Sequence, residues 1–173
     1  MHYIRANLAV CGFDGIGLRE DFLRHGFHAQ LQCTEYFDDW LDDSVDVHRA
    51  HFADGMPIPR TLFNSAQHWL AHHWERGSKI LISCAAGQSR SVTMAIALLH
   101  AKSGLGFVDA ATEVISCVPG AYPHPCVLAS AAAHSGQRQR CEVLQWIYSS
   151  ITKQPPYPWS PELIQQAAEK NYA

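Results

Sequence analysis

The amino-acid sequence predicts an α/β fold, a single domain in which a twisted central sheet of about four to five strands is flanked by helices. The chain has 173 residues, a length that one domain usually accounts for. Strands and one short helix come first, and then a helix, a strand and three more helices, an order that suits helices packed on sheet faces. The composition, 47% hydrophobic and 17% charged, is that of a folded globular protein.

The predicted strands are short. Residues 45–52 have the period-two alternation that is typical of a strand, and one or two strands within residues 1–10 are broken near Asn7. The aspartate-rich segment 35–44 is expected to be irregular or a single helical turn at the surface. The expected strands after residue 10 are 27–33, 45–52 and 80–83.

The predicted helices follow apolar residues at helical spacing. Phe107, Ala111 and Val118, for example, lie on one face of a helix. Gly26 and Gly77 end the helices before them, because glycine readily adopts the left-handed conformation of a helix end. The expected helices are residues 18–25, 60–76, 92–102, 107–118, 126–151 with a break near 135–136, and 160–170.

The domain is expected to comprise residues 1–153. Residues 154–173 contain a stiff proline-rich linker and then a C-terminal helix, with Ser160 as its N-cap and Pro161 at its first helical position. This tail is expected to pack on the domain or to extend it.

The net charge and the cysteine pattern exclude several classes of partner and cofactor. The net charge is −3 and there is no long basic run, which argues against nucleic acid or an anionic membrane as partner. No apolar stretch is long enough to span a membrane and the N-terminus lacks a signal-peptide pattern, so a cytoplasmic location is expected. The six cysteines include no C-x-x-C pair, and free thiols are expected rather than disulfides or a zinc site. No metal ion or other cofactor is therefore predicted.

The stretch from Ile80 to Ser91 carries the chemistry. It has the pattern of a buried strand, a loop of small residues and the start of an apolar helix. Such a loop points its backbone N–H groups inward, and the helix dipole favours an anion there. The same field stabilises a thiolate, so Cys84 is a candidate nucleophile aimed at a bound phosphoryl group.

Phosphoester cleavage needs further groups, and the sequence offers them. The guanidinium of Arg90 can hold two phosphoryl oxygens, and the small loop residues let the backbone N–H groups approach the rest. Asp54, in a Gly/Pro loop after a strand, is the candidate general acid and base. Ser91 can donate a hydrogen bond to the sulfur and help it leave. The expected phosphate-binding residues are Ala85, Ala86, Gly87, Gln88, Ser89 and Arg90.

The segment Cys84-Ala85-Ala86-Gly87-Gln88-Ser89-Arg90-Ser91 resembles the C-x5-R-[ST] signature of the cysteine-based protein tyrosine phosphatases, and most closely that of their compact dual-specificity branch. Asp54-Gly55-Met56-Pro57 resembles the general-acid loop of that branch. The resemblance covers roughly residues 1–150 and implies a cysteinyl-phosphate intermediate with phosphotyrosine as substrate, and it leaves phosphoserine and phosphothreonine open as further substrates. Ser83 departs from the pattern, since the family usually has histidine there. The neutral loop favours a phosphoprotein over an inositol phospholipid.

The resemblance also implies a role for Cys33. Several family members place a second cysteine at the end of the neighbouring parallel strand, where it traps the oxidised nucleophile as a disulfide. The alternative is that Cys33 is a small buried core residue.

Two other functions stay open. A pseudophosphatase would keep the fold and bind phosphate with little turnover, and Ser83 in place of histidine is compatible with it. A rhodanese-like sulfur transferase also uses a cysteine in an anion-binding turn, although Asp54 and the Arg90-Ser91 ending disfavour it. The expected partner is a phosphorylated protein or a small phosphomonoester, and the sequence does not predict the oligomeric state.

Overall fold

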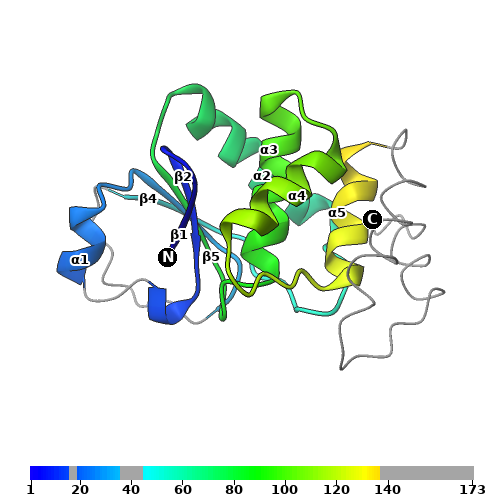
Figure 1. Cartoon of the computed structure of the whole chain (residues 1–173), viewed down its shortest axis with the longest axis horizontal. Coiled ribbons are helices and arrows are strands. Elements are labelled where there is room, and N and C mark those ends of the chain that lie inside the picture. The colour runs from blue at the N-terminus through cyan, green and yellow to red at the C-terminus, as the bar shows by residue number, and fades with distance from the viewer. Residues whose placement is uncertain (16–18, 36–44, 137–173) are drawn as a thin grey trace.

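The computed structural model describes residues 1–15, 19–35 and 45–136 and confirms the α/β fold (Figure 1). Its sheet has five strands in the order β1-β2-β5-β3-β4. Only β1 is antiparallel to its neighbour, and the other strand pairs are parallel. The strands are β1 (His2–Arg5), β2 (Leu8–Cys11), β3 (Ala29–Gln32), β4 (Asp46–Arg49) and β5 (Ile80–Ser83).

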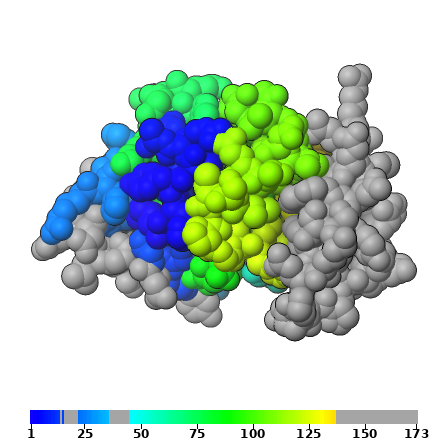
Figure 2. All heavy atoms as spheres, viewed as in Figure 1, coloured from blue at the N-terminus to red at the C-terminus, as the bar shows by residue number. Residues whose placement is uncertain are grey.

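Helices cover both faces of the sheet. A 3-10 helix, η1 (Phe13–Gly15), follows β2, and α1 (Arg19–Arg24) lies on one face. The opposite face carries the four longer helices (Figure 1). On the side turned to the viewer in Figure 2, the N-terminal hairpin and α4 lie side by side. The longer helices are α2 (Arg60–Glu75), α3 (Arg90–Ser103), α4 (Phe107–Cys117) and α5 (Pro125–Ser135).

The alternation of side chains along the strands builds two hydrophobic cores, because successive side chains of a strand point to opposite faces. In β5, Ile80 and Ile82 join the large core beneath the four longer helices. Leu81 joins the smaller core that also contains Phe22 of α1. Helix α3 is buried at every position from Ser91 to Leu99 and forms the centre of the helical layer.

Most predicted elements are present with shifted ends. Strand β4 ends at Arg49 instead of continuing to residue 52, and α3 begins at Arg90 instead of Val92. Helix α5 begins at Pro125 and ends at Ser135, where the sequence indicated a break. The aspartate-rich residues 36–44, the domain boundary at 153 and the tail 154–173 lie outside the described residues.

The sheet topology brings the loops that follow β2, β3, β4 and β5 to the same edge of the sheet. Strands β2, β5, β3 and β4 all run in the same direction, so the loops at their carboxyl ends meet at the same edge of the sheet. Register aligns Ser83 of β5 with Cys11 of β2 on one side and with Gln32 of β3 on the other. Cys84, which follows Ser83 at the end of the central strand β5, therefore lies at the middle of this edge. None of the described helices has the length and apolar character needed to cross a membrane.

Candidate active site

The loop 84–89 joins β5 to α3 and is fixed by backbone hydrogen bonds. The Cys84 N–H donates to the Cys11 carbonyl at 3.1 Å, and the Phe13 N–H donates to the Ala85 carbonyl at 3.0 Å. Both bonds tie the loop to the segment that follows β2. The end of β2 and the residues that follow it therefore hold the start of the loop 84–89 in place.

Two glycines allow these segments to approach. Gly87 has φ +72°, and a Cβ there would collide with the backbone of Cys11 and Gly12. A Cβ on Gly12 would lie 2.6 Å from the carbonyl carbon of Ala86. Real Cβ atoms do not come so close to backbone, so both positions require glycine for this packing.

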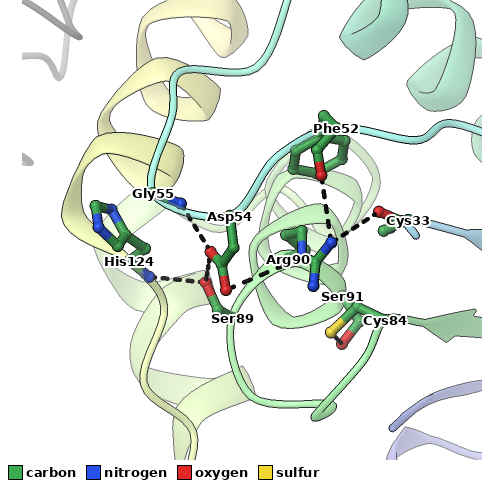
Figure 3. Close-up of polar contacts among 9 residues, drawn as sticks. All are labelled: Cys33, Phe52, Asp54, Gly55, Cys84, Ser89, Arg90, Ser91 and His124. Atoms are coloured by element: carbon green, nitrogen blue, oxygen red, sulfur yellow. Dashed lines mark hydrogen bonds and ion pairs between the residues drawn. The ribbon is translucent and has the colours of Figure 1, made fainter. Parts of the chain in front are cut away.

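Cys84 and Ser91 form a buried pair (Figure 3). The thiol is 2% exposed, and its Sγ lies 3.2 Å from the Oγ of Ser91, which is also buried in the first turn of α3. When the sulfur is ionised it can only accept, and the Ser91 hydroxyl is then the donor. This arrangement suits a sulfur that must carry negative charge.

The guanidinium of Arg90 is held by the carbonyls of two neighbouring loops. Its Nη1 donates to the carbonyl oxygen of Phe52 at 3.3 Å and, more weakly, to that of Cys33 at 3.5 Å (Figure 3). Its Nε is buried and has no hydrogen-bond partner among the described residues. A buried donor without an acceptor costs about 1–3 kcal/mol, and a ligand oxygen would relieve that cost.

Asp54 lies against the loop 84–89, although it is far away in the sequence. Its Oδ1 accepts a hydrogen bond from Ser89 Oγ at 2.7 Å and another from the Gly55 N–H at 3.1 Å. Its Oδ2 lies 4.0 Å from Arg90 Nε. The side chain is 43% exposed, so solvent and substrate can reach it. The structure thus brings Asp54 to the same site as Cys84 and Arg90.

The first turn of α3 has no side-chain cap. Ser89 is the N-cap residue, but its hydroxyl bonds to Asp54 instead of to an N–H of its own helix. An N-cap serine usually satisfies one of the free N–H groups at the helix start. These N–H groups point toward the loop, where the helix dipole favours an anion.

Ser83 occupies the position at which the resemblance predicts histidine. It is fully buried, accepts a hydrogen bond from Gln30 Nε2 at 3.0 Å and donates to the Leu31 carbonyl at 3.3 Å. Its side chain therefore links β5 to β3 directly beneath the loop. The residue is a structural tie between two central strands.

Cys33 and Cys11 surround Cys84 at the ends of the neighbouring strands. Cys33 follows β3, which runs parallel to β5 as expected, and its N–H donates to the Ser83 carbonyl at 2.8 Å. Burial raises the pKa of the Cys33 thiol well above its usual value, nearby Cys84 raises it further, and Arg90 opposes the rise. Burial likewise raises the pKa of Cys11 to about 12. The described cysteines, including these three, are free.

A pocket of about 310 Å³ opens beside Arg90. It lies between the loop that follows β3 and the loop that follows β4. His51 contributes a buried Nε2 atom that has no hydrogen-bond partner in the described part of the chain. The pocket is lined by Thr34, Glu35, His51, Phe52, Ala53 and Arg90.

Four features of the site were not predicted from the sequence. They are the hydroxyl of Ser89 as a partner of Asp54, the position of His124 beside them, and the closeness of Gly12 and Cys11 to the loop. His124 precedes a proline, and proline at a first helical position is a usable signal of a helix start. The other contacts join residues far apart in the chain and leave no local pattern.

Within residues 1–15, 19–35 and 45–136, no three His, Cys, Asp or Glu side chains gather closely enough to hold an ion.

Comparison with known proteins gives a result at the level of structure. No protein-family model matches the sequence, and no curated protein matches it by sequence. Human DUSP28 matches with a TM-score of 0.67 and 19% identity, over 84% of this chain and 98% of that chain. A mouse dual-specificity phosphatase complexed with zinc tungstate matches with a TM-score of 0.70 and 20% identity, over 82% and 90%. DUSP15 matches with a TM-score of 0.65 and 20% identity, over 98% and 96%.

These proteins share the shape of this chain over most of their length while differing at about four residues in five. The chain therefore has the fold of the compact dual-specificity phosphatases.

Proposed function

We propose that this protein is a phosphatase that hydrolyses phosphotyrosine, and also phosphoserine or phosphothreonine, through a cysteinyl-phosphate intermediate. The observation that carries the proposal is the convergence of Cys84, Arg90 and Asp54 on one loop, with the Arg90 Nε as a buried donor that has no hydrogen-bond partner among the described residues. An oxyanion bound over Cys84 would give this donor an acceptor and would also meet the free N–H groups of the first turn of α3.

In the first step, the Cys84 thiolate attacks phosphorus, an S–P bond forms and the ester P–O bond breaks. The Asp54 carboxylic acid donates its proton to the leaving oxygen. Backbone N–H groups of the loop and the Arg90 guanidinium hold the non-bridging oxygens as charge redistributes. The 310 Å³ pocket beside Arg90 gives the leaving group a place next to the acid loop.

In the second step, the Asp54 carboxylate removes a proton from a water molecule whose oxygen attacks phosphorus. The S–P bond breaks and inorganic phosphate forms. The departing sulfur carries negative charge, which the Ser91 hydroxyl stabilises from 3.2 Å. The cycle needs no metal ion and returns both side chains to their starting protonation states.

We also propose that Cys33 protects the nucleophile. Peroxide converts the Cys84 thiolate to a sulfenic acid, and the Cys33 thiol condenses with it, giving a disulfide and water. Cys33 follows β3, the strand next to β5, and Cys84 is near enough to add to the rise in the pKa of the Cys33 thiol that burial causes. A thiol or another reductant then restores both cysteines.

Hydrolysis of p-nitrophenyl phosphate in the presence of a chelator tests the proposed activity. Activity should survive the chelator, disappear in Cys84→Ser and leave a phosphate adduct on Cys84 that rapid acid quenching and mass spectrometry detect. Asp54→Ala should reduce turnover of phenyl phosphate by about 10²-fold or more and that of p-nitrophenyl phosphate by much less, because only the poor leaving group needs the proton. Wild-type protein that binds phosphotyrosine peptide without hydrolysing it would instead indicate a pseudophosphatase.

A further inference from the structure

We propose that Ser89 is a positioning residue for the general acid: its hydroxyl joins Asp54 to the start of α5 and thereby decides which carboxyl oxygen carries the proton. The proposal rests on the proposed phosphatase function and assigns to the Ser89 side chain a role that is separate from phosphate binding by the loop backbone.

The hydrogen-bond directions follow from the chemistry of the donors. The backbone N–H of His124 can only donate, and it lies 2.9 Å from Ser89 Oγ, so the hydroxyl oxygen accepts this bond. The Ser89 hydroxyl proton is then directed to Asp54 Oδ1 at 2.7 Å. A chain of donors therefore runs from the α5 N-terminus through Ser89 to the acid (Figure 3).

This chain of bonds fixes the two carboxyl oxygens in different roles. Oδ1 accepts from both Ser89 Oγ and the Gly55 N–H. An oxygen that receives two donor protons is a poor place for a third, so the acidic proton resides on Oδ2. Oδ2 is the oxygen that faces Arg90, at 4.0 Å from its Nε, on the side where a phosphoryl group would bind.

Helix α5 supplies the rigid end of this arrangement. His124 is its N-cap residue, and the His124 ring accepts a hydrogen bond from the Cys126 N–H at 3.2 Å. Gly55 lies so close to this ring that a Cβ on it would be 3.3 Å from Nε2. The acid loop is thus held between the loop 84–89 and α5, and Ser89 is the side chain that connects all three.

The chain also offers a matched control. Ser130 is a buried serine of α5 that accepts a hydrogen bond from the Ile58 N–H at 2.9 Å, at the other end of the acid loop. Its hydroxyl donates to the Val127 carbonyl of its own helix at 2.8 Å. Ser130→Ala removes an anchor of the same loop to the same helix without touching Asp54. It therefore separates general loosening of the loop from loss of the Asp54 contact.

The test compares phenyl phosphate with p-nitrophenyl phosphate. Ser89→Ala should reduce kcat on phenyl phosphate by roughly ten- to a hundredfold, a part of what a general acid supplies, and should change kcat on p-nitrophenyl phosphate much less. Ser89→Thr, which keeps the hydroxyl, should restore most of the loss. In an Asp54→Ala background, Ser89→Ala should have almost no further effect, because it acts through the acid. Any decrease in kcat that Ser130→Ala causes should be the same for the two substrates.

A second measurement does not depend on turnover. Ser89→Ala removes the acceptor of the His124 N–H, so the hydrogen exchange of that amide should accelerate by about tenfold or more relative to wild type. If the wild-type protein is inactive but Ser89→Ala still accelerates the exchange of the His124 amide, the proposed function is overturned and the hydrogen bond between Ser89 and His124 is supported. An active wild-type protein in which Ser89→Ala and Ser130→Ala have the same leaving-group dependence would overturn the positioning role alone.

Discussion

Replacing the glycines around the loop 84–89 separates two physical reasons for their presence. Gly87 has a positive φ, and a Cβ there would collide with backbone. Gly12 does not have a positive φ, but a Cβ on it would lie 2.6 Å from the carbonyl carbon of Ala86. Gly104 has φ +75°, and a Cβ on it would meet no atom of another described residue within 4 Å. Gly87→Ala therefore tests both effects together, Gly12→Ala tests the collision alone, and Gly104→Ala tests the positive φ alone.

The expected magnitudes follow from these environments. A left-handed conformation costs a non-glycine residue about 1–2 kcal/mol, so Gly104→Ala should lower the free energy of unfolding by that amount. Overpacking against rigid backbone costs about 1–3 kcal/mol, which is the expectation for Gly12→Ala. Gly87→Ala combines both effects and should cost about 2–5 kcal/mol. For a chain of this length, each 1 kcal/mol lowers Tm by about 2–4 °C.

Turnover should distinguish the two variants with a backbone collision from Gly104→Ala more sharply than the free energy of unfolding does. The collision at Gly87 or Gly12 must move the loop that carries Cys84, so turnover of p-nitrophenyl phosphate should fall by at least about tenfold in both variants. Gly104→Ala should leave turnover unchanged, because Gly104 is the C-cap of α3 and its new Cβ would touch no other described part of the chain. Urea denaturation and steady-state kinetics measure the two quantities. If Gly87→Ala matched Gly104→Ala in both, the argument from close backbone packing would be refuted.

Three further predictions concern single side chains of the site. Ser91→Ala should slow hydrolysis of the phosphoenzyme more than its formation, so that a burst of p-nitrophenol precedes a steady rate reduced by about tenfold; equal slowing of both steps would contradict the assignment. Cys33→Ser should make inactivation by peroxide irreversible, whereas dithiothreitol should restore the wild type, and because burial raises the pKa of Cys33, disulfide formation should accelerate as pH rises. Burial lowers the pKa of His124 and nearby Asp54 partly opposes this, so the unfolded chain binds more protons and stability should decrease as pH falls below about 6.5 toward the lower folded pKa. His124→Asn keeps a capping side chain and should flatten this part of the Tm profile between pH 8 and 5.5; an unchanged slope would count against it.

The sequence predicted the elements of the fold better than their ends. Residues 45–52 have period-two character, yet β4 ends at Arg49, one residue before the Ala50 N–H that donates to the Gln32 carbonyl of β3 at 2.9 Å. Beyond the strand, Ala50 and Phe52 join the large core, and His51 and Phe52 both border the pocket beside Arg90. Periodicity reports which side chains are buried, and it does not report where the backbone hydrogen bonds of a ladder stop.

By itself the sequence determined the α/β class, the central strand of residues 80–83 and the candidate set of Cys84, Arg90, Asp54 and Ser91. Each of these follows from local patterns, because a strand, a small-residue turn and a helix start are encoded by adjacent residues. Only the tertiary structure decided that the Ser89 hydroxyl bonds to Asp54, that His124 supports it, and that Gly12 packs on the loop. The first two contacts join Ser89 to residues 35 positions away on either side, Asp54 after β4 and His124 at the start of α5, and the third joins the segment after β2 to the loop after β5. Such a distance in sequence is closed by the packing of the whole sheet and leaves no periodic signal in the chain.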